Sequence, residues 1–193
     1  MPQRAATSPF PPGDPAVSHH EVPPAGVGWA TAASAVTAPP FPTQTTVPVV
    51  IGCHGGAGTT TVARLIGGVV ADMHVAVVNA AMASLIFVFV AWGNPYGARC
   101  AAEAFQRAPM PLLRRAGLIV VADGPWPRPR QATMRYRILS GQVAHVAYLP
   151  YVARWRYVDD PLGEKIPAPV THVVDRVRRW VASATPQTHR RSP

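Results

Sequence analysis

The sequence has little lysine, little cysteine and little charge. Of its 18 basic residues only Lys165 is a lysine, and the others are arginines. Charged residues make up 14% of the 193 residues, whereas soluble proteins carry about 25%. Two cysteines, Cys53 and Cys100, are too few for a disulfide framework or a four-cysteine zinc site. A mechanism that needs a lysine must therefore use Lys165, and the cysteine count favours a reducing, cytoplasmic location.

Several catalytic patterns are also missing. The chain shows no Ser/His/Asp order, no paired carboxylates and no H-E-x-x-H motif, so hydrolase and metalloprotease functions lack support. Residues 75–92 are 18 uncharged residues, the shortest length that spans a membrane. Asn79, Ser84 and the β-branched and aromatic residues of 85–90 favour a strand instead, so we do not expect membrane association. Whether 75–78 or 85–90 forms the second strand stays open.

Proline is abundant and divides the chain. The sequence has 23 prolines, of which ten lie in residues 1–46. Proline fixes φ and lacks an N–H donor, so this stretch predicts a disordered tail with some polyproline II character. We expect the folded domain at 47–184 and a short polar tail at 185–193.

Strand-like and helix-like segments alternate within 47–184. This alternation predicts an α/β fold with a parallel sheet of about four to six strands and helices on both faces. Strands are expected at residues 47–53, 84–92, 117–123 and 143–149, and helices at 97–107, 129–140 and 170–181. A further helical face is formed by Val62, Leu65, Ile66, Val69, Val70 and Met73. Gly67 and Gly68 weaken that helix.

The strongest chemical signal is residues 51–63, IGCHGGAGTTTVA. A buried strand, a glycine-rich turn and a helix that opens with threonines describe a cradle for phosphate. Glycines let backbone N–H groups surround an anion, and the helix N-terminus adds the positive end of its dipole.

This loop resembles the deviant Walker loop of the ParA/MinD partitioning ATPases, K-G-G-x-G-K-[ST]. Its places are taken in order by His54, Gly55, Gly56, Ala57, Gly58, Thr59 and Thr60. The glycines and Thr60 match, whereas His54 and Thr59 replace the two lysines. The resemblance implies a P-loop NTPase-like fold that binds ATP with Mg²⁺ through these residues, with Thr60 as the magnesium ligand.

The resemblance extends further along the chain. GLIVVADGP, residues 117–125, is similar to the strand that carries the switch aspartate of that family, which implies a nucleotide-binding role for Asp123. Residues 143–152 are similar to the segment beside which the base packs. The run 47–161 also resembles a family of uncharacterised actinobacterial proteins associated with plasmids and integrative elements, which keeps a W-R-Y-like motif near 155–157.

The missing lysine has a chemical consequence. That ammonium bridges the β- and γ-phosphates and stabilises transition-state charge, so its loss predicts weak or no ATP hydrolysis. Lys165 lies too far along the chain to replace it. Arg64, Arg128 and Arg130 are alternative cations, but the sequence favours a solvated basic rim for these arginines over a phosphate-binding role.

Other residues have both a functional and a structural interpretation. His54 is either a phosphate donor or a loop side chain facing solvent, and Asp123 is either a ligand-binding group or a turn cap. Cys53 is either a thiol with a lowered pKa or a small buried residue. Tryptophans beside arginines, at 126, 155 and 180, indicate either nucleic-acid stacking or packing at the edge of the core.

The leading hypothesis is a degenerate ParA/MinD-like nucleotide-binding protein, a pseudo-ATPase that serves mobile-element maintenance or transfer. We expect a protein partner. Residues 49–193 carry a net charge of +10, which also permits DNA binding through the arginine clusters. The alternatives are a scaffold that keeps the fold without binding a nucleotide, and a basic DNA-binding accessory factor.

Overall fold

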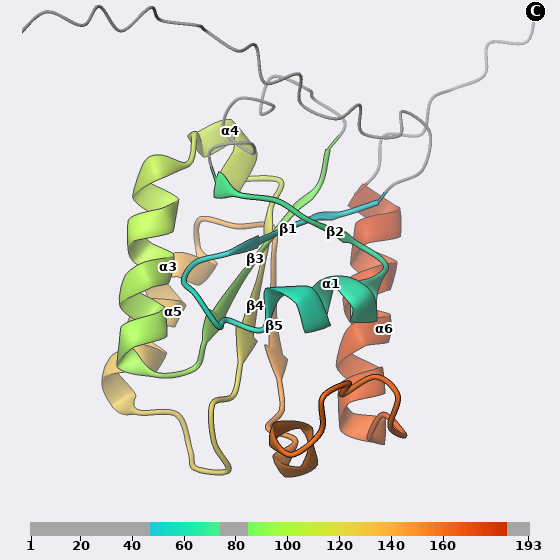
Figure 1. Cartoon of the computed structure of the whole chain (residues 1–193). Helices are drawn as coiled ribbons and strands as arrows, with labels where there is room; N and C mark the ends of the chain where they lie inside the picture. Colours follow the sequence, from blue (N-terminus) through green and yellow to red (C-terminus); the bar gives the residue numbers. More distant parts are fainter. Residues whose placement is uncertain (1–46, 74–84, 185–193) are drawn as a thin grey trace, which may run out of the picture. The chain divides into compact units, whose positions relative to one another are not determined.

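A computed structural model describes residues 47–73 and 85–184, and these form a parallel five-stranded sheet flanked by helices (Figure 1). The sheet order is β2-β1-β3-β4-β5. The strands are β1 (Val49–Gly52), β2 (Val69–Val70), β3 (Phe87–Trp92), β4 (Gly117–Val121) and β5 (His145–Leu149). The helices are α1 (Thr59–Ile66), α3 (Pro95–Arg107), α4 (Met110–Leu113), α5 (Arg130–Ser140), α6 (Ala168–Ala184) and the short 3₁₀ helix η2 (Ala153–Arg156). The predicted α/β architecture is confirmed.

The inner strands are buried on both faces, which explains their unbroken apolar sequences. All residues of β3 except Trp92 are buried. Side chains alternate across the sheet, and an inner parallel strand is covered by helices on both sides, so both alternating sets must be apolar. The register pairs Val49 of β1 with Phe87 of β3 and Val88 of β3 with Gly117 of β4.

The helices cover the two faces separately. On one face α3 and α5 pack over a core in which Phe89 meets Phe105 edge to face at 5.1 Å between ring centroids. On the other face α1 and α6 pack over a second core that includes Val62 and Val88 (Figure 1). The expected inward face of α6 is confirmed, because its valines at 170, 173, 174, 177 and 181 are all buried.

The first helix is shorter than its apolar pattern predicts. It ends at Ile66, where Gly67 takes a left-handed conformation (φ 73°) and its N–H bonds to the carbonyl of Ala63. A Cβ at Gly68 would lie 2.6 Å from the Pro48 carbonyl oxygen, so the chain turns back closely against β1 there. Val69 and Val70 then form the exposed edge strand β2 rather than a continued helix face.

The second strand of the described residues is β2 at Val69–Val70, a position that neither alternative of the sequence analysis proposed. β3 occupies Phe87–Trp92, inside the predicted strand 84–92, whereas residues 75–78 lie outside the described part of the chain. No helix in residues 47–73 or 85–184 is long and apolar enough to cross a membrane. The predicted tails, 1–46 and 185–193, also lie outside the described residues.

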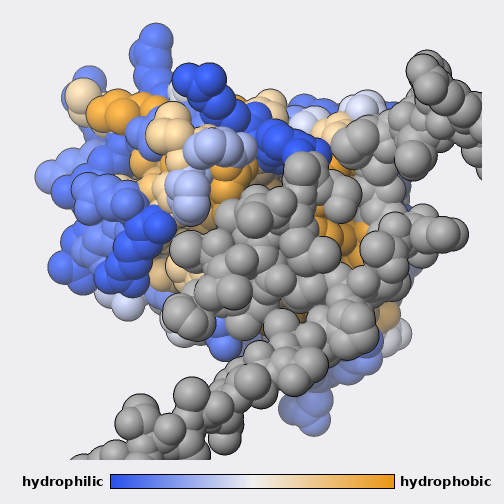
Figure 2. Space-filling view, turned by 90° about the horizontal axis from the view of Figure 1, so that it is seen from above, coloured by the Kyte–Doolittle hydropathy of each residue, from blue (hydrophilic) through white to orange (hydrophobic). Residues whose placement is uncertain are grey.

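The surface near the amino-terminal ends of the strands is mixed in character. Figure 2 looks onto this end and shows hydrophilic residues gathered on the side formed by α3, α4 and α5, with apolar residues among them. Arg107 at the end of α3 and Arg114 just after α4 are exposed, as is Met110 of α4. The glycine-rich loop lies at the opposite, carboxyl-terminal end of the sheet.

Candidate functional site

The glycine-rich loop lies at the point where the order of the strands reverses. From β1 the chain crosses through α1 to β2 on one side, and from β3 it crosses through α3 to β4 on the other. α1 and α3 cover opposite faces, so the loops that leave β1 and β3 diverge (Figure 1). In open α/β sheets ligands bind in the crevice outside the carboxyl ends of the strands at this switch point. The predicted position of the loop, between an inner strand and a helix start, is confirmed.

The loop leaves the N-terminus of α1 open. Gly56 and Gly58 have positive φ values of 73° and 85°, which favour glycine. Gly58 is the N-cap and provides no side-chain hydrogen bond, and the N–H of Val62 bonds back to its carbonyl at 2.9 Å. The N–H groups of Thr59 and Thr60 precede that bond, so they and the positive end of the helix dipole face outward.

A cavity of about 270 Å³, here called the loop cavity, is lined by residues 56–61. It brings together Gly56, Ala57, Gly58, Thr59 and Thr60 of the predicted site. Gly55 is exposed, with no heavy atom within 4 Å of the position its Cβ would take, and it does not line this cavity. The backbone and three threonine hydroxyls are thus what the loop offers a ligand, a set suited to phosphate oxygens.

His54 turns away from the loop cavity and ties the loop to β3. Its Nδ1 donates to the Gly55 carbonyl at 2.9 Å, and its Nε2 accepts from the Trp92 N–H at 3.1 Å. The ring also meets Trp92 and Tyr96 edge on, with centroids 4.9 and 5.3 Å apart. Both ring nitrogens are occupied, so in this structure the half-buried imidazole has no free N–H for a phosphate.

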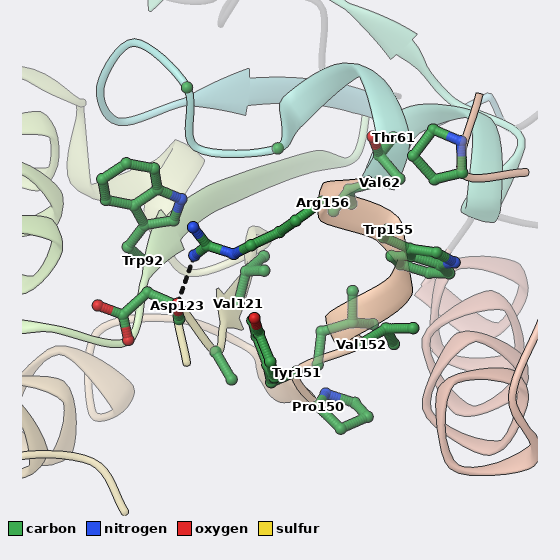
Figure 3. A pocket seen from close by; sticks show the side chains of 15 residues that line it. Thr61, Val62, Trp92, Val121, Asp123, Pro150, Tyr151, Val152, Trp155 and Arg156 are labelled. Carbon is green, nitrogen blue, oxygen red and sulfur yellow. Dashed lines mark hydrogen bonds between the residues drawn. The ribbon is translucent and has the colours of Figure 1, made fainter. Parts of the chain in front are cut away.

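A second cavity of about 280 Å³, here called the aromatic cavity, adjoins the first (Figure 3). The two share Gly56, Gly58 and Thr61 in their lining. The rest of the aromatic cavity is contributed by the carboxyl ends of β3, β4 and β5 and by η2. Its lining includes Trp92, Asp123, Tyr151, Trp155 and Arg156. The two cavities together therefore offer a ligand polar backbone at the loop end. At the other end they offer aromatic side chains, the carboxylate of Asp123 and the guanidinium of Arg156.

Asp123 lines the aromatic cavity but not the loop cavity. Its Oδ2 accepts from Nδ2 of Asn94 at 2.7 Å, while Oδ1 of Asn94 accepts from the Gly97 N–H at 2.8 Å and caps α3.

Neighbouring strands lie about 4.8 Å apart. Because β3 separates β1 from β4, the strand ends that carry the loop and Asp123 are about 10 Å apart. A ligand that touches both must extend across the end of β3.

Arg156 is the residue that the sequence analysis missed. It extends from η2 across the aromatic cavity and donates to the backbone carbonyl of Asp123 (Figure 3). Its guanidinium also lies 5.5 Å from the ring of Tyr151. The signal available in the sequence was the W-R-Y-like motif after the last predicted strand, but nothing in its spacing showed which way the arginine points.

The cations considered from sequence lie elsewhere. Arg64 pairs with Asp160 through contacts of 2.7 and 3.2 Å, and Arg128 stacks over Tyr148 at 4.0 Å. Arg130 is the exposed first residue of α5, and Lys165 is exposed before α6. None of these four lines either cavity. Hydrogen bonding to Arg64 lowers the pKa of Asp160 below its usual value and raises that of Arg64.

Cys53 is not an activated thiol. It packs against the core beneath α3, and burial raises the pKa of its thiol to about 12. The hypothesis of a lowered pKa at the helix N-terminus is wrong, because desolvation outweighs the hydrogen bond to Val90.

The tryptophans divide by environment. Trp155 and Trp180 pack against the core beneath α6, as the structural interpretation of the sequence expects. Trp180 also stacks on His145 with centroids 5.0 Å apart. Trp126 is 81% exposed. Trp155 has a second place in the structure, in the lining of the aromatic cavity.

The loop cavity has no metal site of its own. The loop cavity is lined by glycine, alanine and threonine residues, Thr60 among them, and by no carboxylate. Asp123 lines the aromatic cavity instead. Within residues 47–73 and 85–184, no group of three or more His, Cys, Asp or Glu side chains is placed to hold a metal ion. A Mg²⁺ ion there needs most of its oxygen ligands from elsewhere.

No protein-family model matches this sequence, and a search of curated proteins finds no significantly similar relative.

Proposed function

We propose that this protein binds a nucleotide, with the phosphates in the loop cavity and at its junction with the aromatic cavity beside Gly56 and Gly58, and with the base and sugar in the rest of the aromatic cavity. The observation that carries the proposal is the open N-terminus of α1, which a glycine-rich loop presents at the switch point of the sheet beside an aromatic cavity. This is the arrangement expected of a degenerate ParA/MinD-like protein with a P-loop-type domain. A role in mobile-element maintenance or transfer has support from the sequence resemblance alone, and a cytoplasmic location has support from the low cysteine count.

Each part of such a ligand meets matching chemistry. The N–H groups and dipole of α1 stabilise phosphate charge without any side chain. Trp92 and Tyr151 offer aromatic surface for a base in the adjoining cavity. Asp123 has further acceptor positions for a ribose hydroxyl or a base amine. The separation of about 10 Å between the ends of β1 and β4 is one that an extended nucleotide can bridge.

Efficient hydrolysis is not part of the proposal. Thr59 puts no charge where the phosphate-binding lysine of the ParA/MinD pattern belongs, and no carboxylate lines the loop cavity. In the proposed ATP complex, phosphate oxygens and water supply most ligands of Mg²⁺, and the Thr60 hydroxyl supplies one. Without a lysine in the loop and without a carboxylate in the loop cavity, transition-state charge is poorly stabilised, so the protein is a pseudo-ATPase.

The test is a titration with a fluorescent ATP analogue and Mg²⁺, on wild type and on Thr60→Glu. A carboxylate in the first turn of α1 favours the helix through its dipole, yet repels a phosphate in the loop cavity. We expect Thr60→Glu to melt no lower than wild type and to lose at least about tenfold in affinity, equivalent to about 1.4 kcal/mol.

Thr171→Glu is the matched control. Thr171 is an exposed threonine near the start of α6 that lines neither cavity, so this variant should bind like wild type. Equal losses in both variants, or no loss in either, would contradict a phosphate site at the loop. No wild-type binding at millimolar nucleotide would favour the scaffold alternative.

A further inference from the structure

Building on the proposed function, we infer that Arg156 binds the phosphates of the nucleotide and supplies the positive charge that the loop lacks. This places the missing cation after β5, in η2, rather than in the loop or in the segment after Asp123. Arg156 then contacts the ligand directly and makes the site prefer a nucleotide with several phosphates over a nucleoside.

The position of the Arg156 side chain is the first observation that supports this inference. Arg156 lines the aromatic cavity together with Gly56 and Gly58, the two loop glycines with positive φ. Figure 3 shows its side chain reaching over this cavity from η2 toward Trp92 and Asp123. The guanidinium therefore lies in the space that connects the loop with the carboxyl end of β4.

The second observation is that the positive charge of Arg156, unlike that of two nearby arginines, is not paired with a carboxylate of the described residues. Arg64 and Arg154 pair with Asp160 and Glu164, at 2.7 and 3.1 Å. Among the described residues no carboxylate lies within ion-pair distance of Arg156, whose hydrogen bond goes to a neutral carbonyl. A guanidinium has five N–H donors and matches phosphate geometry in a bidentate manner. Within the described part of the chain, Arg156 thus brings to the cavity a positive charge that no carboxylate neutralises.

The third support is the anchoring of the segment that carries Arg156. The Arg154–Glu164 pair joins η2 to the following loop, and the Arg64–Asp160 pair joins that loop to α1. Asp160 also accepts from the N–H of Leu162 at 3.1 Å. These contacts hold the backbone of η2 near α1, so the guanidinium is placed before a ligand arrives.

The experiment compares the affinities of wild type, Arg156→Ala, Arg156→Lys and Arg130→Ala for ATP, ADP and adenosine, by calorimetry with Mg²⁺ present. We expect Arg156→Ala to weaken ATP binding about 10- to 100-fold and adenosine binding less than about threefold, because a charged hydrogen bond to phosphate is lost. Arg156→Lys should recover part of the ATP affinity. Arg130→Ala removes the same charge outside both cavities and should bind like wild type.

The outcomes separate this inference from the proposed function. If wild type binds ATP and Arg156→Ala binds it equally well, the role of Arg156 is wrong and the nucleotide site stands. Equal weakening of ATP and adenosine would show that Arg156 only shapes the cavity through Asp123. Equal weakening in Arg130→Ala would indicate a general charge effect. If wild type binds none of the three ligands, the proposed function and this inference both fail.

Discussion

Thr59 is the first residue of α1 and lies against the backbone of Gly52, where an added Cβ would be 2.5 Å from its Oγ1. It also lines the loop cavity. Because Gly52 leaves room there, the first atoms of a longer side chain at position 59 can follow the same path. The position thus offers a direct test of how much one cation contributes.

We expect Thr59→Lys to bind Mg-ATP at least about tenfold more tightly than wild type, since a charged hydrogen bond to phosphate contributes about 1.5–3 kcal/mol. Wild type should release phosphate at a negligible steady-state rate. Titration and a phosphate-release assay measure the two quantities. Robust wild-type turnover would overturn the pseudo-ATPase proposal, and unchanged affinity in Thr59→Lys would show that no nucleotide reaches the loop.

His145 makes the folded protein sensitive to acid. Its ring stacks on Trp180 at an interplanar angle of 12°, and its buried Nε2 has no hydrogen-bond partner among residues 47–73 and 85–184. Burial lowers the pKa of this imidazole below 6.5, and the charge of Arg176 lowers it further. As the pH falls below about 6.5, the unfolded chain takes up a proton that the folded protein does not. Stability therefore decreases until the folded pKa is reached.

His145→Phe keeps the stacked ring and removes both the unpaired nitrogen and the titration. We expect its melting temperature to rise by about 2–4 °C, the shift that about 1 kcal/mol produces in a chain of this size. The decrease in melting temperature between pH 7.5 and 5 should also become smaller. His172→Gln, at an exposed position of α6, is the control and should leave both unchanged. A larger acid sensitivity in His145→Phe would contradict the assignment.

At the scale of elements, the start of α3 fixes the end of β3 and with it one wall of the site. A Cβ at Gly97 would lie 2.2 Å from the Trp92 carbonyl oxygen. That oxygen also accepts a hydrogen bond from the Tyr136 hydroxyl of α5. α3 can thus approach β3 closely only because residue 97 has no side chain.

Gly97→Ala should lower the free energy of unfolding by about 1–3 kcal/mol, the usual cost of overpacking. It should also change the fluorescence of Trp92 and weaken nucleotide binding. Urea denaturation measures the first effect. Gly55→Ala is the control, because nothing lies within 4 Å of the added Cβ and its φ is not positive. Wild-type stability in Gly97→Ala would show that α3 can shift away without cost.

At the scale of the whole molecule, both described cores are formed by residues between Val49 and Ala184. We therefore expect a chain of residues 47–184 to melt at the same temperature as the full chain and to bind the nucleotide equally well. Thermal melts and the same titration test this. A lower melting temperature would mean that residues outside 47–184 contribute to the core.

The sequence by itself determined the class of the fold and the place of the glycine-rich loop between a strand and a helix. Inner strands such as β3 are continuous apolar runs because helices cover both of their faces, and α6 shows its buried valines at helical spacing. The glycines of the loop are local signals as well, since glycine takes a positive φ without steric cost, as Gly56 and Gly58 do. The end of α1 was the exception. There the apolar period ran on through Val69 and Val70, while Gly67 and the close approach of Gly68 to Pro48 ended the helix.

Only the tertiary structure decided how the site is assembled. His54 and Trp92 are 38 positions apart in sequence, and Asp123 and Arg156 are 33 apart, yet each pair is joined by a hydrogen bond. Such contacts depend on the order of the strands, which places β3 between β1 and β4 and brings η2 to their carboxyl ends. Periodicity reports which face of an element is buried, but not which elements become neighbours. For that reason the sequence pointed to Arg128 and Arg130 for the missing charge, whereas packing puts Arg156 in the cavity.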